Sequence, residues 1–194
     1  MPAETDVRVR TLVSAFVDDA VSCWLVPDAD AREQVYLDWF GLVVEHADRV
    51  GAVKAGESVV EVWLRGTEGE PPRMLDDAGE RRMAEVAGPF LDRVGVLGEL
   101  TGARHPVGAH WYLSLIGVAP HHQRTGVGTA ALAASLREYD RAGLPTYLEA
   151  SSLASRALYA RLGFTDLGGP IELPGGPDLY PMWRAVGGRG GERR

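Results

Sequence analysis

Residues 115–128 read LIGVAPHHQRTGVG and are the part of this 194-residue chain that best defines its fold. Their first half continues an apolar run that begins at His110, which is typical of a buried strand. Gly126 and Gly128 then precede a segment with helical periodicity that extends to about Ala142. The stretch therefore predicts a strand, a loop with glycines and a long helix, in that order.

The start of the predicted helix is a suitable site for an anion. The first amides of a helix have no partner within it and point outward. Gly126 and Gly128 lack a Cβ, so a phosphate can approach the backbone closely, and Arg124 adds a permanent positive charge. A dinucleotide-binding loop would need glycine where the chain has Ala131. An ATP-binding P-loop would need lysine where it has Thr129. We therefore expect a phosphate site of neither class.

A second motif follows the long helix. Residues 155–164 read SRALYARLGF, which predicts a short helix that carries Tyr159 and ends at Gly163. Residues 123–128, Gln-Arg-x-Gly-x-Gly after an apolar strand, resemble the cofactor motif of GNAT-superfamily N-acetyltransferases, and residues 155–164 resemble the second signature of that superfamily. The run from 111 to 183 is similar to its puromycin N-acetyltransferase-like bacterial members, and it covers a little under half of the chain.

This resemblance implies a mixed α/β fold, a central mixed sheet flanked by helices. We expect one domain over residues 1–186, with an acceptor-side half at about 6–109 and an acetyl-CoA-binding half at about 110–186, and a disordered tail at 187–194. In the family the strand matching 111–118 splays from the next strand, and the pantetheine arm of acetyl-CoA lies in the gap like an added strand. Gly117 is expected to mark the bulge that opens the sheet.

The resemblance also implies the residues of the cofactor site. Ser155 stands where the family usually has asparagine, and its shorter side chain weakens that expected contact. The predicted acetyl-CoA contacts are Ile116, Gly117, Val118, Gln123, Arg124, Thr125, Gly126, Val127, Gly128, Thr129, Ser155 and Tyr159.

Two side chains are predicted to move protons. Tyr159 is the expected general acid, since attack of an amine on a thioester expels a thiolate that a nearby phenol can protonate. The amine must lose a proton, and Glu149 is the first candidate for its base, with His110 the second. His121 and His122 are expected to lie in a solvated loop, because no further ligands cluster with them. We predict no metal.

The amino-terminal half predicts two helices and a hairpin. Apolar residues recur at helical spacing over 6–20, and a second helix is expected from a capping box at Asp30 and Glu33 to about His46. Runs at 50–54 and 59–64 form the hairpin, and helical pieces follow at 81–87 and 90–100. In the carboxyl-terminal half, further strands are expected at 146–150, 164–173 and 179–185. The strand that usually precedes the first helix of a GNAT domain is expected to be missing. A second copy of the chain is then a candidate cover for the exposed edge, as a homodimer.

Composition limits the partners. The net charge of −7 disfavours nucleic acid and anionic membranes in bulk. Cys23, the single cysteine, is expected in the core and allows no internal disulfide, which suits a cytoplasmic protein. No run approaches the length of a membrane span or a signal sequence. Residues that could line a pocket for a cationic acceptor are Asp18, Asp19, Trp24, Tyr36, Asp38, Trp39 and His46.

The expected activity is transfer of acetyl from acetyl-CoA to a primary amine, with a small molecule favoured as acceptor. An aminonucleoside, a polyamine, an amino acid and a protein lysine or amino terminus all stay open. The alternative from another class is a module that binds acyl-CoA without turnover, against which the presence of Tyr159 argues.

Overall fold

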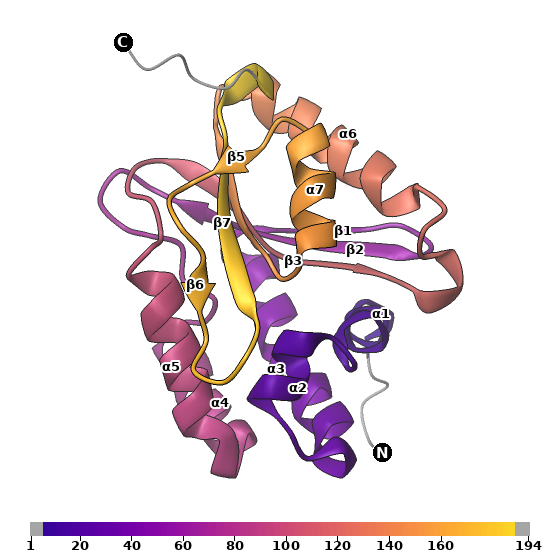
Figure 1. Cartoon of the computed structure of the whole chain (residues 1–194), viewed down its shortest axis with the longest axis vertical. Coiled ribbons are helices and arrows are strands. Elements are labelled where there is room, and N and C mark those ends of the chain that lie inside the picture. Colours follow the sequence, from indigo (N-terminus) through magenta and orange to yellow (C-terminus); the bar gives the residue numbers. More distant parts are fainter. Residues whose placement is uncertain (1–5, 189–194) are drawn as a thin grey trace.

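The computed structural model describes residues 6–188 and contains a mixed sheet between two groups of helices (Figure 1). The helices are α1 (Val7–Phe16), α2 (Ala20–Leu25), α3 (Ala29–Val50), α4 (Asp77–Ala87), α5 (Leu91–Gly102), α6 (Val127–Arg141) and α7 (Leu153–Arg161). The strands are β1 (Ala52–Ala55), β2 (Val59–Gly66), β3 (His110–Val118), β4 (Thr146–Ala150), β5 (Thr165–Asp166), β6 (Ile171–Glu172) and β7 (Asp178–Arg184). Asp6, the described residue before α1, caps that helix, and β1 forms one edge of the sheet. The predicted absence of a first strand concerns residues 1–5, which lie outside the described part of the chain.

Aspartates set the starts of the first three helices. The helix predicted over 6–20 is divided, because the Asp19 carboxylate accepts a hydrogen bond from Val21 N (2.9 Å) and begins α2. Asp28, rather than the predicted Asp30, caps α3 by accepting from Asp30 N at 3.0 Å. Helix α3 is longer than expected and ends at Val50. Cys23 of α2 is half-buried rather than in the core.

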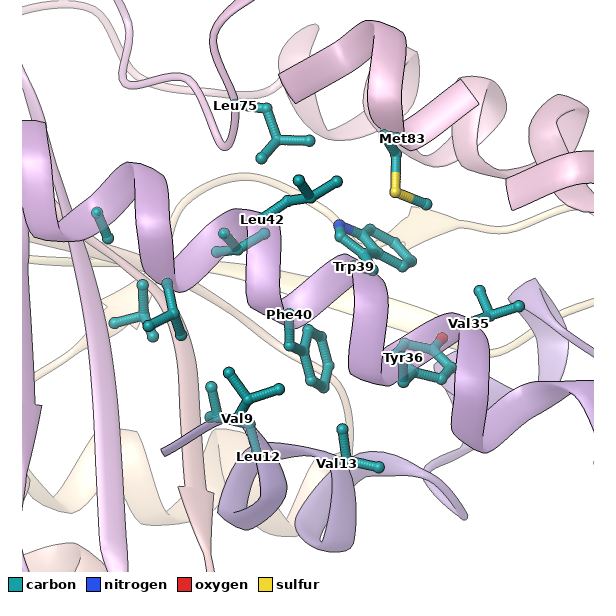
Figure 2. Close-up of a cluster of buried hydrophobic side chains, with 14 of the residues drawn as sticks. Val9, Leu12, Val13, Val35, Tyr36, Trp39, Phe40, Leu42, Leu75 and Met83 are labelled. Atoms are coloured by element: carbon teal, nitrogen blue, oxygen red, sulfur yellow. The ribbon is translucent and has the colours of Figure 1, made fainter. Parts of the chain in front are cut away.

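The first helices pack on one face of the sheet. Figure 2 shows Tyr36, Trp39 and Phe40 of α3 above Val9 and Leu12 of α1, within one cluster of buried apolar side chains. Tyr36 and Trp39 stack with ring centroids 5.6 Å apart. The same cluster includes the side chains of β2 that point to this face, so the helices of the amino-terminal half form its cover.

Helices α6 and α7 lie on the other side of the sheet (Figure 1). Leu132 and Leu136 of α6 are buried against Trp63 of β2 and Leu148 of β4, in a second apolar cluster. The two clusters use alternate residues of the same strands, because successive side chains of a strand point to opposite faces. Each face of the sheet therefore has its own core.

The sheet order is β1-β2-β3-β4-β7-β5, with β6 paired to β7. Only the β3–β4 pair is parallel among these pairings. The register of β2 and β3 shifts between Val62 and Trp63, so that Ser114 is the extra residue of a bulge, and its Oγ donates to Val62 O at 3.1 Å. The predicted bulge at Gly117 is wrong, since Gly117 pairs regularly with Val60.

Gly117 has a packing role instead. A Cβ at this position would lie 3.1 Å from Leu12 Cδ2 and 3.2 Å from Ala15 Cβ. The missing side chain therefore lets α1 lie directly on the carboxyl end of β3.

The carboxyl-terminal region departs from prediction in one strand. Residues 164–173 form β5 and β6 instead of one strand, because Gly168, Gly169 and Pro170 separate them and Gly168 has φ +80°. Gly187 and Gly188 of the predicted disordered tail lie in a short 3₁₀ helix, Val186–Gly188, and residues 189–194 lie outside the described part of the chain.

Candidate active site

The parallel strands β3 and β4 separate along their length. They pair at only two positions, Trp111 with Thr146 and Tyr112 with Tyr147. Beyond these, β3 stays paired with β2 as far as Val118, while β4 stays paired with β7 to its end. The facing edges of β3 and β4 therefore leave backbone groups without a ladder partner, which an extended ligand can use.

The loop after β3 presents backbone amides. Gly126 caps α6 with φ +89°, and Arg124 has φ +62°, the only positive φ of a non-glycine residue within 6–188. The first α6 amide with a backbone acceptor is that of Ala130, which donates to Gly126 O at 2.9 Å. Among the described residues the amides of 124–129 have no hydrogen-bond acceptor within the chain. These groups and the exposed Arg124 form a concentrated site for an anion.

Short contacts hold this loop against the end of β3. Gln123 Nε2 donates to Val118 O at 3.1 Å, and Thr125 Oγ1 donates to His122 O at 2.7 Å. A Cβ on Gly128 would lie 2.7 Å from Val118 Cγ2, so glycine is needed there for packing. A Cβ on Gly126 would meet open space. Of the two predicted glycines, Gly126 is the one that leaves room for a ligand.

Helix α7 carries the second predicted motif. Ser152 and Ser155 form a capping box, in which each hydroxyl oxygen accepts from the backbone amide of the other at 3.1 Å. Ser155 therefore orders the start of α7, one turn before Tyr159. The half-buried Tyr159 packs on Phe164 with ring centroids 5.9 Å apart. Its position on α7 places it on the α6 side of the sheet.

Burial and the nearby charges of Asp19 and Glu61 raise the pKa of Tyr159 to about 12. The phenol is therefore protonated near neutral pH and has a proton to give.

The residues of this site fall largely within one known family of proteins. The sequence model of the family described as Acetyltransferase (GNAT) family matches residues 13–164. This chain belongs to the GNAT acetyltransferase family. It is an acyltransferase by that membership, and GNAT enzymes use acetyl-CoA and act on amine acceptors.

Individual relatives agree with this assignment. An uncharacterized N-acetyltransferase of Schizosaccharomyces pombe is 28% identical over an alignment of 173 positions, and the match covers 79% of this chain and 68% of that protein. A crystal structure described as histone acetyltransferase HPA2 and related acetyltransferase, from Corynebacterium glutamicum, is 25% identical with a TM-score of 0.69, and 96% of this chain matches 93% of that one. A putative arylalkylamine N-acetyltransferase of the mosquito Aedes aegypti shares the fold, at 14% identity and a TM-score of 0.58, over 92% and 82% of the two chains.

Glu149 of this acetyltransferase lies on β4, on the face opposite α6 and α7. Its neighbours in sequence, Leu148 and Ala150, point into the α6 core, and strand alternation directs Glu149 the other way. Burial raises the pKa of Glu149 to about 7, and the nearby phenols of Tyr112 and Tyr147 oppose this rise only in part. Its Oε1 is buried and has no hydrogen-bond partner among the described residues.

The second base candidate, His110, and the loop histidines His121 and His122 lie in different surroundings. His110 is fully buried, its Nδ1 lies 2.8 Å from Gly108 O, and burial lowers the pKa of its imidazole. His121 and His122 are exposed in the loop before α6, as predicted.

Within residues 6–188 no group of three or more His, Cys, Asp or Glu side chains is arranged to hold a metal ion. No helix of that part is long and apolar enough to cross a membrane.

Of the predicted acceptor-pocket residues, Asp19 lies closest to the gap. Its Oδ2 accepts a hydrogen bond from Ser151 Oγ (3.3 Å), directly after β4. Tyr36 and Trp39 belong to the buried apolar cluster of Figure 2. The remaining predicted residues are exposed (Asp18, Asp38), buried (His46) or bonded to Pro174 O through the indole (Trp24).

A hollow of about 310 Å³ opens elsewhere on the molecule. Its lining comes from α1, α3 and the residue before α1, and includes Arg8, Leu37 and Asp48. None of its lining residues belongs to β3, β4, α6 or α7. The strand gap is therefore the better candidate for the active site, because it carries the motif residues.

Sequence reasoning missed two features of the site. His105 lies in the loop after α5, where the sequence showed no clear pattern, and its ring packs on Tyr112 and Tyr147. The spacing of Tyr147 and Glu149 on one strand was a usable signal, since residues two apart share a face. Glu61 is the second feature, a carboxylate between Val60 and Val62 of strand β2 that is 1% exposed.

Proposed function

We propose that this chain transfers the acetyl group of acetyl-CoA directly to the primary amine of a small molecule while both substrates are bound. The observation that carries the proposal is the separation of β3 from β4 beyond Tyr112 and Tyr147, at the end where the amides of 124–129 begin α6. A pantetheine arm can pair with the free strand edge while a pyrophosphate binds the amides. The residues present therefore suit acetyl-CoA, which supplies a thioester as acetyl donor.

Tyr159 is the proposed general acid. Its phenol retains a proton at neutral pH, because its pKa is raised to about 12. When the amine nitrogen bonds to the acetyl carbon and the carbon–sulfur bond breaks, the phenol protonates the departing sulfur. The position of Tyr159 on α7 puts this proton on the α6 side of the sheet.

Glu149 is the proposed general base and acts from the opposite face. An ammonium group cannot attack a carbonyl, so one of its protons must first pass to an acceptor. A carboxylate whose pKa lies at about 7 is available at neutral pH and is a stronger base than an exposed one. Since the strands are separate near both residues, the amine and the leaving sulfur can lie on different sides of the gap.

A cationic small molecule is the proposed acceptor. Asp19 and Glu149 give the acceptor side negative charge, and Ser151 holds the Asp19 side chain next to the end of β4. The net charge of −7 adds a general attraction for cations. The putative arylalkylamine N-acetyltransferase among the fold neighbours is consistent with a small amine, whereas the histone acetyltransferase name of the Corynebacterium protein favours testing protein lysines too.

The first test is ligand-induced stabilisation of the purified chain. Acetyl-CoA and CoA are expected to raise the unfolding temperature, since a ligand at 100 times its Kd stabilises a protein by about 2.7 kcal/mol, while ATP and NAD should not. Release of CoA is then measured with a panel of polyamines, arylalkylamines, amino acids, aminonucleosides and lysine peptides. If CoA is released only with the lysine peptides, the acceptor is a protein and the proposed small-molecule acceptor is wrong. Binding without turnover across the panel would favour an acyl-CoA-binding module.

A further inference from the structure

Two histidines meet behind Glu149. His105 Nε2 and His110 Nε2 lie 3.0 Å apart, and His110 Nδ1 lies 2.8 Å from Gly108 O. A carbonyl oxygen only accepts, so His110 Nδ1 carries the hydrogen and its Nε2 is the acceptor of a neutral ring. His105 Nε2 must then donate. With both rings neutral, the two bonds fix the tautomer of each.

Two tyrosines connect this pair to the carboxylate. The ring centroid of His105 lies 4.9 Å from that of Tyr112 and 4.7 Å from that of Tyr147, both edge-on. The same two phenols lie beside Glu149 and influence its pKa. His105 therefore packs on the residues that enclose the carboxyl group, although it lies 44 residues earlier in the sequence.

The enclosure leaves polar atoms without partners. Tyr147 Oη and Glu149 Oε1 are both buried, and neither has a hydrogen-bond partner among the described residues. Burying a polar atom without a hydrogen-bond partner lowers the stability of the fold, so such an atom calls for an explanation other than stability. A carboxyl group that must exchange a proton is such a reason.

We infer that His105 and His110 are positioning residues for Glu149, and that as a locked neutral pair they close a dry compartment of Tyr112, Tyr147 and the carboxyl group. This inference rests on the proposed function and extends it to residues outside the cofactor motifs.

The compartment acts by excluding both water and charge. Burial lowers the pKa of His110, and burial together with the charge of His110 lowers that of His105 to about 4, so burial favours the neutral form of both rings. A cationic imidazole next to Glu149 would favour its charged form and make it a weaker base. Two charged side chains lie in the surroundings of Glu149. The charge of Arg104 lowers the pKa of Tyr147, and Asp19 accepts a hydrogen bond from Ser151, but neither charge contributes to the pKa shift of Glu149.

The test removes the His105 ring and follows the titration of Glu149. In His105→Ala, water can enter between Tyr112 and Tyr147, so the pKa of Glu149 should fall by about one unit or more toward its ordinary value. His105→Phe keeps the ring packing and should retain most of the elevation. Val107→Ala is the matched control, because Val107 is on the same loop and 92% exposed.

Two readouts separate this inference from the proposed function. Carbon-13 NMR of the glutamate carboxyl groups, with Glu149→Gln for assignment, follows the titration without any turnover. The pH profile of kcat/KM with an accepted amine should show the same shift of its acidic limb. At pH values well below the pKa of the base, each unit of pKa shift changes kcat/KM about tenfold. An unshifted carboxyl titration in folded His105→Ala would overturn the positioning role. A shifted titration with an unchanged rate profile would keep the compartment but remove Glu149 as the base.

Discussion

Glu61 and Glu149 are carboxylates of neighbouring parts of one sheet, yet their environments differ in kind. Glu61 points to the α6 face, where Ser135 Oγ donates to its Oε2 at 2.5 Å and Trp63 Nε1 donates to the same oxygen at 2.8 Å. Glu149 points to the other face, and burial raises its pKa to about 7, whereas Oε1 of each carboxylate is buried without a partner among the described residues. Two donors hold one oxygen of the first carboxylate in place, whereas burial of the second favours its neutral form.

The difference separates a carboxylate that ties elements together from one that can exchange a proton. Glu61 joins β2 to α6 through Ser135, so it stabilises the helix that begins with the amide-rich loop. Glu149 joins nothing through Oε1, and its ionisation near neutral pH suits a general base. The largest expected effects therefore follow from changes on the catalytic side of this comparison.

The largest effect is expected for Tyr159→Phe, which removes the proposed acid and keeps the ring on Phe164. We expect kcat to fall on the order of 10²–10⁴-fold, because the proton is needed only as sulfur departs. The KM for acetyl-CoA should change little, since packing is retained. Steady-state kinetics with varied acetyl-CoA measure both. A rise in KM at unchanged kcat would make Tyr159 a binding residue.

Glu149→Gln is the next largest and compares directly with Glu61→Gln. Loss of the base should lower kcat/KM on the order of 10²-fold at pH 8 and abolish the acidic limb near pH 7. Glu61→Gln should keep that limb, because its carboxylate faces α6 and lies outside the enclosure of Glu149. Rate profiles between pH 5.5 and 9 distinguish them. An intact limb in Glu149→Gln would assign the base to another group.

A smaller effect is expected for changes at Gly126, in the loop between β3 and α6. Gly126→Asp and Gly126→Asn put side chains of one shape into open space at φ +89°, and only the first adds a negative charge. Asparagine also tolerates this backbone conformation better than most residues. We expect Asp to weaken acetyl-CoA binding at least about tenfold relative to Asn, measured by calorimetry, because charge repels the pyrophosphate. Equal affinities would place the pyrophosphate elsewhere.

The sequence predicted the cofactor side better than the acceptor side, for a physical reason. The strands 110–118 and 146–150 agree with prediction residue by residue, because apolar runs bounded by Pro, Gly and loop residues are local signals. The amides of the α6 start follow from helix geometry at Gly126. Such features depend on residues close together in the sequence, and periodicity can find them.

The enclosure of Glu149 depends on distant residues. His105 reaches Tyr147 only because β3 and β4 are parallel neighbours at Tyr112 and Tyr147, a pairing that no local pattern specifies. The bulge at Ser114 escaped prediction for the same reason, since it is a property of the register between two strands. Likewise Tyr36 was read as a pocket residue, although the packing of α1 on α3 buries it.

The smallest effect is in stability, where the two carboxylates should respond with opposite sign at pH 8. Ionising Glu149 in the folded state is unfavourable because its folded pKa is raised from 4.5 to about 7. The folded state then binds the proton more tightly than the unfolded chain, so its stability declines as pH rises between these values. Glu149→Gln removes this decline and should be more stable than the wild type at pH 8, on the order of 2–3 kcal/mol.

Glu61→Gln should instead be less stable at pH 8, by about 1–3 kcal/mol, because a buried amide nitrogen replaces one oxygen and the bonds from Ser135 and Trp63 lose a charged acceptor. Urea unfolding of both variants at pH 4.5 and pH 8 measures the difference, and the advantage of Glu149→Gln should disappear at the lower pH. If Glu149→Gln is destabilised at pH 8 as Glu61→Gln is, the carboxylate on β4 also holds elements together in its charged form, and the distinction between the two faces of the sheet fails.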